Sequence, residues 1–131
     1  MIIAALTLLL AQSAAPAAAS TPTEEDVARE TAVIDKVFDK WQGGIYKKED
    51  DKLTCRMKQS SGDQAVDLLR CGAMIGCYAP RAEELDTIAA SDAPAEDRKA
   101  QMQDVMNEVQ PCIEKAHREG KRRIAIVRAA E

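Results

Sequence analysis

Residues 53–77, LTCRMKQSSGDQAVDLLRCGAMIGC, carry the pattern that decides the fold. Over 53–58 apolar residues alternate with polar ones, which is the two-residue period of a half-buried strand. The Ser-Ser-Gly-Asp run over 60–63 then ends the strand and caps the next element. We expect a helix over 63–77. Because apolar residues occupy most of its circumference, we expect it to be the central and most buried helix.

The sequence on the N-terminal side predicts a first helix and a partner strand. The helix is expected to begin with Thr21 as its N-cap and with Glu24 in the capping-box position. The glycine pair at 43–44 is expected to end it, since glycine adopts the left-handed C-cap conformation at little cost. A strand at Ile45–Lys47 then pairs with 53–58 through a charged turn, which predicts a short β-hairpin.

The C-terminal part of the chain predicts two more helices. A short one is expected over 81–90, and a long one from Ala95 to the end, with its apolar residues on one face. Pro111 is expected to kink the long helix because it removes a backbone hydrogen bond, and Gly120 to weaken it. In the central helix, the G-x-x-x-G pair at 72 and 76 is expected to be a flat patch on which another element packs closely.

Together these elements predict an α+β fold: one predominantly helical small domain over residues 20–131, with one short β-hairpin and two disulfides. The sequence has only four aromatic residues, so its core must be built from Ala, Val, Leu, Ile and Met, which suits closely packed helices. The net charge of −4 is spread over mixed charges. Nucleic acid is therefore not an expected partner, because phosphate binding needs a clear positive excess over one face.

Residues 1–19 are typical of a cleavable signal peptide. The uncharged apolar run over 1–11 is shorter than the roughly 20 residues that span a bilayer. Ala17 and Ala19 occupy the −3 and −1 positions of an A-x-A cleavage site. The alternative is an uncleaved anchor, since no Lys or Arg precedes the apolar run. We expect an exported protein of bacterial type, periplasmic or secreted, without a transmembrane segment after cleavage.

The chain has four cysteines, Cys55, Cys71, Cys77 and Cys112, an even number that in an exported chain of this length predicts a disulfide framework. A bond between Cys71 and Cys77 is disfavoured, because six helical residues separate their Cα atoms by about 9 Å, beyond the limit of about 7 Å. Two pairings remain: Cys55–Cys71 with Cys77–Cys112, or Cys55–Cys77 with Cys71–Cys112. We prefer the first, because it ties the hairpin and the last helix to the central helix.

The segment 55–80 resembles the Cys-bearing strand-turn-helix segment of TonB-type C-terminal domains. In that family a strand with a cysteine runs into Ser-Ser-Gly and then into a helix with Leu-Asp and, in some members, a second cysteine. The residues that carry the resemblance are Cys55, Arg56, Ser60, Ser61, Gly62, Val66 (in the Leu position), Asp67 and Cys71, with Tyr78 and Pro80 near the Phe-x-Pro of the family. The resemblance implies the strand-turn-helix arrangement and the Cys55–Cys71 bond, and it does not carry the function of the family.

No catalytic constellation stands out, and neither a metal nor a cofactor is expected. The single histidine, His117, lies in a polar stretch and is expected to be a solvated helix residue. Met102 and Met106 share a helix face, as copper ligands do, but core packing is the favoured interpretation. No C-x-x-C motif is present, so a thioredoxin-like redox site lacks its signature.

The basic C-terminal helix is a candidate contact surface. Lys121, Arg122, Arg123 and Arg128 are possible contacts for an acidic partner or anionic lipid, although cations near a helix C-terminus also complement its dipole. The first function hypothesis is a non-enzymatic module that binds another envelope protein. The alternatives are a small redox-active or other enzyme with a labile cysteine pair, and a membrane-surface protein that docks through the basic helix.

Overall fold

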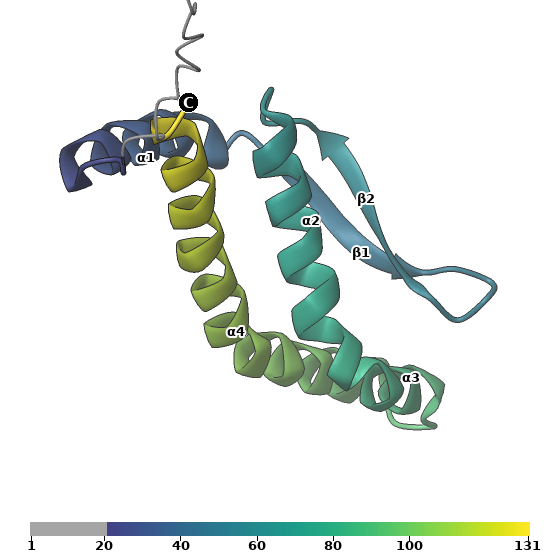
Figure 1. Ribbon diagram of the computed structural model, residues 1–131. Coiled ribbons are helices and arrows are strands. Elements are labelled where there is room, and N and C mark those ends of the chain that lie inside the picture. Colours follow the sequence, from purple (N-terminus) through teal and green to yellow (C-terminus); the bar gives the residue numbers. More distant parts are fainter. Residues whose placement is uncertain (1–20) are drawn as a thin grey trace, which may run out of the picture.

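The computed structural model describes residues 21–131, so the predicted signal peptide lies outside the described residues. The elements in chain order are α1 (Glu24–Phe38), β1 (Gln42–Lys47), β2 (Leu53–Gln59), α2 (Gln64–Tyr78), the 3-10 turn η1 (Ala79–Arg81), α3 (Ala82–Ala90) and α4 (Ala95–Ala129) (Figure 1). The two strands form an antiparallel hairpin in which Ile45 lies opposite Cys55. The predicted α+β fold, mostly helical with one hairpin and two disulfides, is confirmed. No helix in the described part is long and apolar enough to cross a membrane.

Helix α1 begins two residues later than predicted. Thr23, not Thr21, is the N-cap, and its hydroxyl accepts a hydrogen bond of 3.1 Å from the backbone N–H of Asp26. The Asp26 carboxylate accepts in return from the backbone N–H of Thr23, which completes a capping box. This start places Glu24, Glu25 and Asp26 in the first turn, where the helix dipole favours negative charge.

The glycine pair does not end α1, which is a second correction. The helix ends at Phe38, and Gly43 and Gly44 belong to β1. A Cβ at Gly43 would lie 2.6 Å from the ring of Trp41 and 2.7 Å from the carbonyl oxygen of Arg56. Gly43 therefore serves the close approach of a strand to the buried Trp41 ring, and not a helix C-cap.

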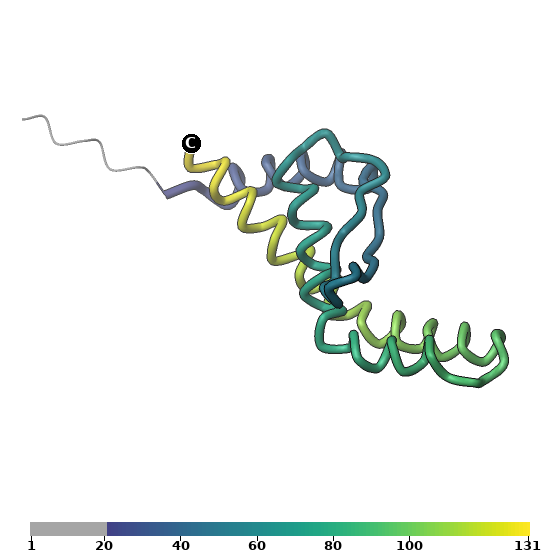
Figure 2. The backbone as a smooth tube through the Cα atoms, turned by 90° about the vertical axis from the view of Figure 1, so that its right-hand side faces the viewer, coloured from purple at the N-terminus to yellow at the C-terminus, as the bar shows by residue number. Residues whose placement is uncertain are grey.

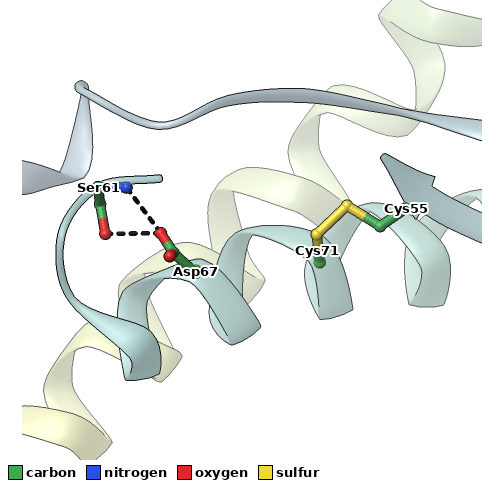
Figure 3. Close-up of a disulfide and its surroundings, with 4 residues drawn as sticks. All are labelled: Cys55, Ser61, Asp67 and Cys71. Atoms are coloured by element: carbon green, nitrogen blue, oxygen red, sulfur yellow. Dashed lines mark hydrogen bonds between the residues drawn. A yellow bond between two sulfur atoms is a disulfide. The ribbon is translucent and has the colours of Figure 1, made fainter. Parts of the chain in front are cut away.

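The hairpin is joined to α2 by one disulfide and one short turn. Cys55 on β2 bonds to Cys71 on α2, with Cα atoms 5.5 Å apart (Figure 3). Between them, buried Ser61 donates from both its backbone N–H and its hydroxyl to the Asp67 carboxylate, at 2.8 and 2.7 Å. Gly62 has a φ of +87°, which residues with a Cβ rarely adopt. This glycine therefore allows the tight turn between β2 and α2.

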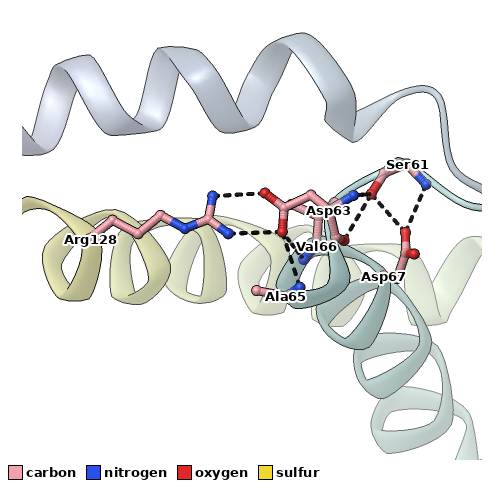
Figure 4. Close-up of polar contacts among 6 residues, drawn as sticks. All are labelled: Ser61, Asp63, Ala65, Val66, Asp67 and Arg128. Carbon is pink, nitrogen blue, oxygen red and sulfur yellow. Dashed lines mark hydrogen bonds and ion pairs between the residues drawn. The ribbon is translucent and has the colours of Figure 1, made fainter.

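Asp63 links the same turn to the far end of the chain. As the N-cap of α2 it accepts hydrogen bonds from the backbone N–H groups of Ala65 and Val66 (Figure 4). Its two carboxylate oxygens also accept hydrogen bonds from the terminal guanidinium nitrogens Nη1 and Nη2 of Arg128 on α4, at 2.7 and 2.8 Å. The hydrogen bond from Arg128 is the main cause that lowers the pKa of the Asp63 carboxyl. One carboxylate thus starts α2 and anchors the end of α4.

Helix α4 bends in its middle and packs against different partners on either side. The change of direction is visible in both views (Figures 1 and 2) and fits Pro111, which lies within the helix and lacks a backbone N–H. The second half of α4 packs with α1 and α2 around one buried cluster: Val27, Ile34, Phe38, Val66 and Ala125. The first half packs with α2 and α3 around another: Cys77, Tyr78, Val105, Val109 and Ile113. The apolar interior is therefore divided between two small clusters.

Helix α2 is not buried on all sides, which corrects its predicted role. Leu68 is 67% exposed. A Cβ at Gly72 or Gly76 would meet no atom within 4 Å, so nothing in the described chain packs on the G-x-x-x-G pair. The close helix approach occurs instead at Gly120 of α4, where a Cβ would overlap the side chain of Leu69. Gly120 thus marks the site where α2 and α4 approach closely.

Asp63→Ala is expected to lower the free energy of unfolding by about 2–3 kcal/mol. An N-cap contributes about 1 kcal/mol, and the partly buried Arg128 would lose its partner. Asp63→Asn, which can still cap α2, should cost less than the alanine variant. Urea unfolding followed by circular dichroism at pH 7 measures both, with the exposed Asp92→Ala as the control. A loss for Asp63→Ala no larger than for the control would contradict the anchoring role.

Candidate functional site

All four predicted disulfide cysteines are paired as preferred. The second bond, Cys77–Cys112, joins the end of α2 to the middle of α4 with Cα atoms 5.9 Å apart. The two bonds close loops of 16 and 35 residues, worth about 3 and 4 kcal/mol on the chain-entropy estimate. No free thiol remains. Each bond joins two different elements of the fold.

Three of the four predicted basic contacts are engaged in ion pairs within the chain. Lys121 lies 2.8 Å from Asp35, Arg122 lies 3.0 Å from Glu24, and Arg128 pairs with Asp63. Arg123 is exposed, beside a shallow hollow that also contains Ala65, Ile124 and Val127. The internal pairs leave less positive charge for an outside ligand than the sequence alone suggests. Lipid or partner contact by these residues stays a prediction.

An apolar depression lies between the hairpin, the end of α2, α3 and the first half of α4. It has a volume of about 390 Å³ and is lined by Gly43, Gly44, Ile45, Met74, Tyr78, Leu85, Met102 and Met106. None of these residues carries a charge at neutral pH. We call this set of residues the apolar groove. A second hollow of about 230 Å³ shares Ile45, Leu85 and Met102 with it and extends it along α3.

Each wall of the apolar groove is tied to its neighbours. The Cys55–Cys71 bond holds the hairpin on α2. Arg81 bridges α3 and α4, donating at 2.6 Å to both Glu84 and Glu108. Lys47 at the end of β1 pairs with Asp86 on α3. The groove is therefore a largely pre-formed cavity, as ligand sites in proteins usually are.

One wall of the apolar groove is an unpaired sheet edge. The sheet has two strands, and the outer edge of β1 has no backbone hydrogen-bond partner among residues 21–131. Gly43 and Gly44 leave this edge without side chains next to the groove. A bare edge offers backbone donors and acceptors to an additional strand.

The methionines of α4 are not core residues as predicted. Met106 is 48% exposed and Met102 is half-buried, and both line the apolar groove together with Met74 of α2. The helical spacing of Met102 and Met106 indicates that they share one face of α4. It does not indicate whether α3 covers that face. The sequence does not identify the other groove residues, because apolar residues in a core and in a groove have the same sequence pattern. These residues are Met74, Tyr78, Leu85 and Ile45.

Cationic and aromatic side chains surround Phe38. Arg70 lies 4.7 Å from the centre of the Phe38 ring and 4.9 Å from that of Trp41, and Lys121 lies 4.8 Å from the Phe38 ring. The His117 ring meets Phe38 edge-on, at 4.9 Å. Nitrogen atoms of Trp41, Arg70 and His117 are buried without a hydrogen-bond partner in the described chain. We call these five residues the cation–aromatic cluster.

The prediction that His117 is a solvated residue is wrong. Its ring is half-buried, and burial is the main cause that lowers the His117 pKa to about 4, with the positive charges of Arg70 and Lys121 adding to the effect. The imidazole is therefore neutral at pH 7. The cluster joins α1, α2 and α4 by packing and cation–aromatic attraction.

Comparisons of the chain with known protein families, with curated proteins and with solved structures find no match. Within residues 21–131, no group of three or more His, Cys, Asp or Glu side chains is placed to hold a metal ion.

We expect the protein to lose stability as the pH falls from about 6.5 to about 4. In this window the unfolded chain protonates His117, whose ordinary pKa is about 6.5, while the folded chain does not. His117→Phe should remove this dependence, which we expect to be on the order of 2 kcal/mol, since partial exposure reduces the full effect of the shift. Urea unfolding between pH 4.5 and 7.5 measures it, and an equal slope in both proteins would contradict the assignment.

Proposed function

We propose that this chain is a non-enzymatic exported protein that binds an apolar, extended segment of another envelope protein in the apolar groove. The observation that carries the proposal is a solvent-open groove of about 390 Å³, lined only by apolar residues and Tyr78 and bordered by an unpaired strand edge. Binding sites for other molecules are typically such concave and mostly apolar surfaces.

The chemistry of the lining supports binding over catalysis. Tyr78 is the only titratable residue among the lining residues, and burial raises its pKa further above neutrality. It is therefore protonated at physiological pH and does not act as a base. The single histidine belongs to the cation–aromatic cluster, where it is neutral and packed against Phe38.

The strand edge supports an extended partner segment. A peptide that adds to β1 would gain main-chain hydrogen bonds along the edge, and every second side chain would point toward the groove. The partner segment is therefore expected to have apolar residues at alternate positions. The ion pair between Lys47 and Asp86 at the end of β1 sets one end of the apolar region.

Export is the second element of the proposal. Two disulfides that join separate elements are compatible with an oxidising compartment such as a periplasm or the exterior. The envelope is therefore the place to look for the partner.

Met106→Glu is expected to reduce partner binding by at least about tenfold, because the partner would bury an unpaired carboxylate. The matched control is Val127→Glu, which adds the same charge at an exposed site on the other half of α4. A photo-crosslinking amino acid placed at position 106 or at 127 identifies the contact in exporting cells. The same amino acid placed at Leu85, which also lines the apolar groove, compares the adduct yields of the Met106→Glu and Val127→Glu variants. We expect one adduct of defined mass from position 106 only. Equal adducts from both positions, or none from 106, would contradict the proposal.

A further inference from the structure

The soft donor atoms of this chain are concentrated in the apolar groove. All four cysteines are held in disulfides, so no thiolate is offered to a metal ion. Of the four methionines in the described chain, Met74, Met102 and Met106 line the apolar groove, and Met57 does not. Thioether sulfur is a soft ligand that selects monovalent copper over harder cations.

The backbone places the three thioethers around one space. Met102 and Met106 are one turn apart on α4, a spacing at which side chains are neighbours. Met74 comes from α2 and borders the same volume of about 390 Å³. Methionine has three rotatable side-chain bonds, and rotation about them is what would turn the three sulfur atoms toward one ion.

The surroundings favour a monovalent ion over a divalent one. The apolar groove has no carboxylate among its lining residues, and oxygen ligands are what Ca²⁺ and Mg²⁺ require. A single positive charge also costs less to remove from water than a double charge. The aromatic ring of Tyr78 lines the same space, and an aromatic face attracts cations. Met106 is 48% exposed, so an ion in solvent can reach this side chain.

We propose that Met74, Met102 and Met106 form a thioether site for Cu(I), for which Ag(I) serves as a redox-inert probe. The site holds one ion per chain. It goes beyond the binding of a protein segment and does not depend on it, because it uses the sulfur atoms and not the apolar character of the groove.

The test is a titration of the disulfide-intact protein, labelled with ¹³C at the methionine methyl groups, with Ag(I) in chloride-free buffer. We expect the methyl signals of Met74, Met102 and Met106 to shift together and to saturate at one equivalent. Met57 is the internal control, because at 47% exposed it is as accessible as Met106. Signals that shift independently, or a Met57 signal that shifts in parallel with the others, would overturn the site.

Substitution provides the second arm. Leucine conserves the volume and apolar character of methionine, so the triple variant Met74→Leu, Met102→Leu, Met106→Leu is expected to keep the fold. In anaerobic competition with a chromophoric Cu(I) chelator, this variant should lose at least about a hundredfold in affinity, and Met57→Leu less than twofold. Unchanged affinity of the triple variant would overturn the site. Partner binding is tested separately in the triple variant, with the photo-crosslinking amino acid placed at Leu85. A triple variant that loses Cu(I) affinity but keeps its crosslinked adduct has lost the metal site and not partner binding.

Discussion

The structure depends on the two covalent links made by α2. Cys71 fixes the hairpin to this helix and Cys77 fixes α4 to it, so three elements are held on one central helix. The constraint matters because apolar burial is divided between two small clusters, one at each half of α4. Neither cluster is large, and small cores leave little stability after the entropy of folding is subtracted. Linking the elements restricts the unfolded chain and compensates for that shortage.

The bend in α4 explains why the molecule has two interiors and an open groove. A straight helix of 35 residues would extend well past α2, which has 15 residues. With the bend near Pro111, one half lies against α1 and the other runs beside the short α3. Because α3 has only nine residues and the sheet only two strands, neither covers the space next to β1. The apolar groove is what remains uncovered.

The two polar arrangements of the chain perform different tasks. The Asp63 carboxylate accepts hydrogen bonds from Arg128 and from the first backbone N–H groups of α2. These hydrogen bonds are directional, so they fix the position of α4 relative to the start of α2. The cation–aromatic cluster instead leaves buried nitrogen atoms of Arg70 and His117 without hydrogen bonds. It is stabilised by positive charges over aromatic faces. Burial of the neighbouring His117 lowers the pKa of its imidazole, which therefore resists protonation. The stability contributed by this region is therefore expected to fall as the pH drops from about 6.5 to about 4.

The sequence by itself determined the strand, turn and helix of residues 53–77 and the kinked last helix, because period, capping and proline chemistry act over a few residues. Helix spacing reduced the disulfide pairings to two, and the tertiary structure shows the preferred one. Only the tertiary structure decided which faces are covered. Glycines 72 and 76 lie bare while Gly120 carries the close contact, and Met106 faces solvent instead of a core. The physical reason is that coverage depends on how far each helix reaches along its neighbour, which no local pattern records.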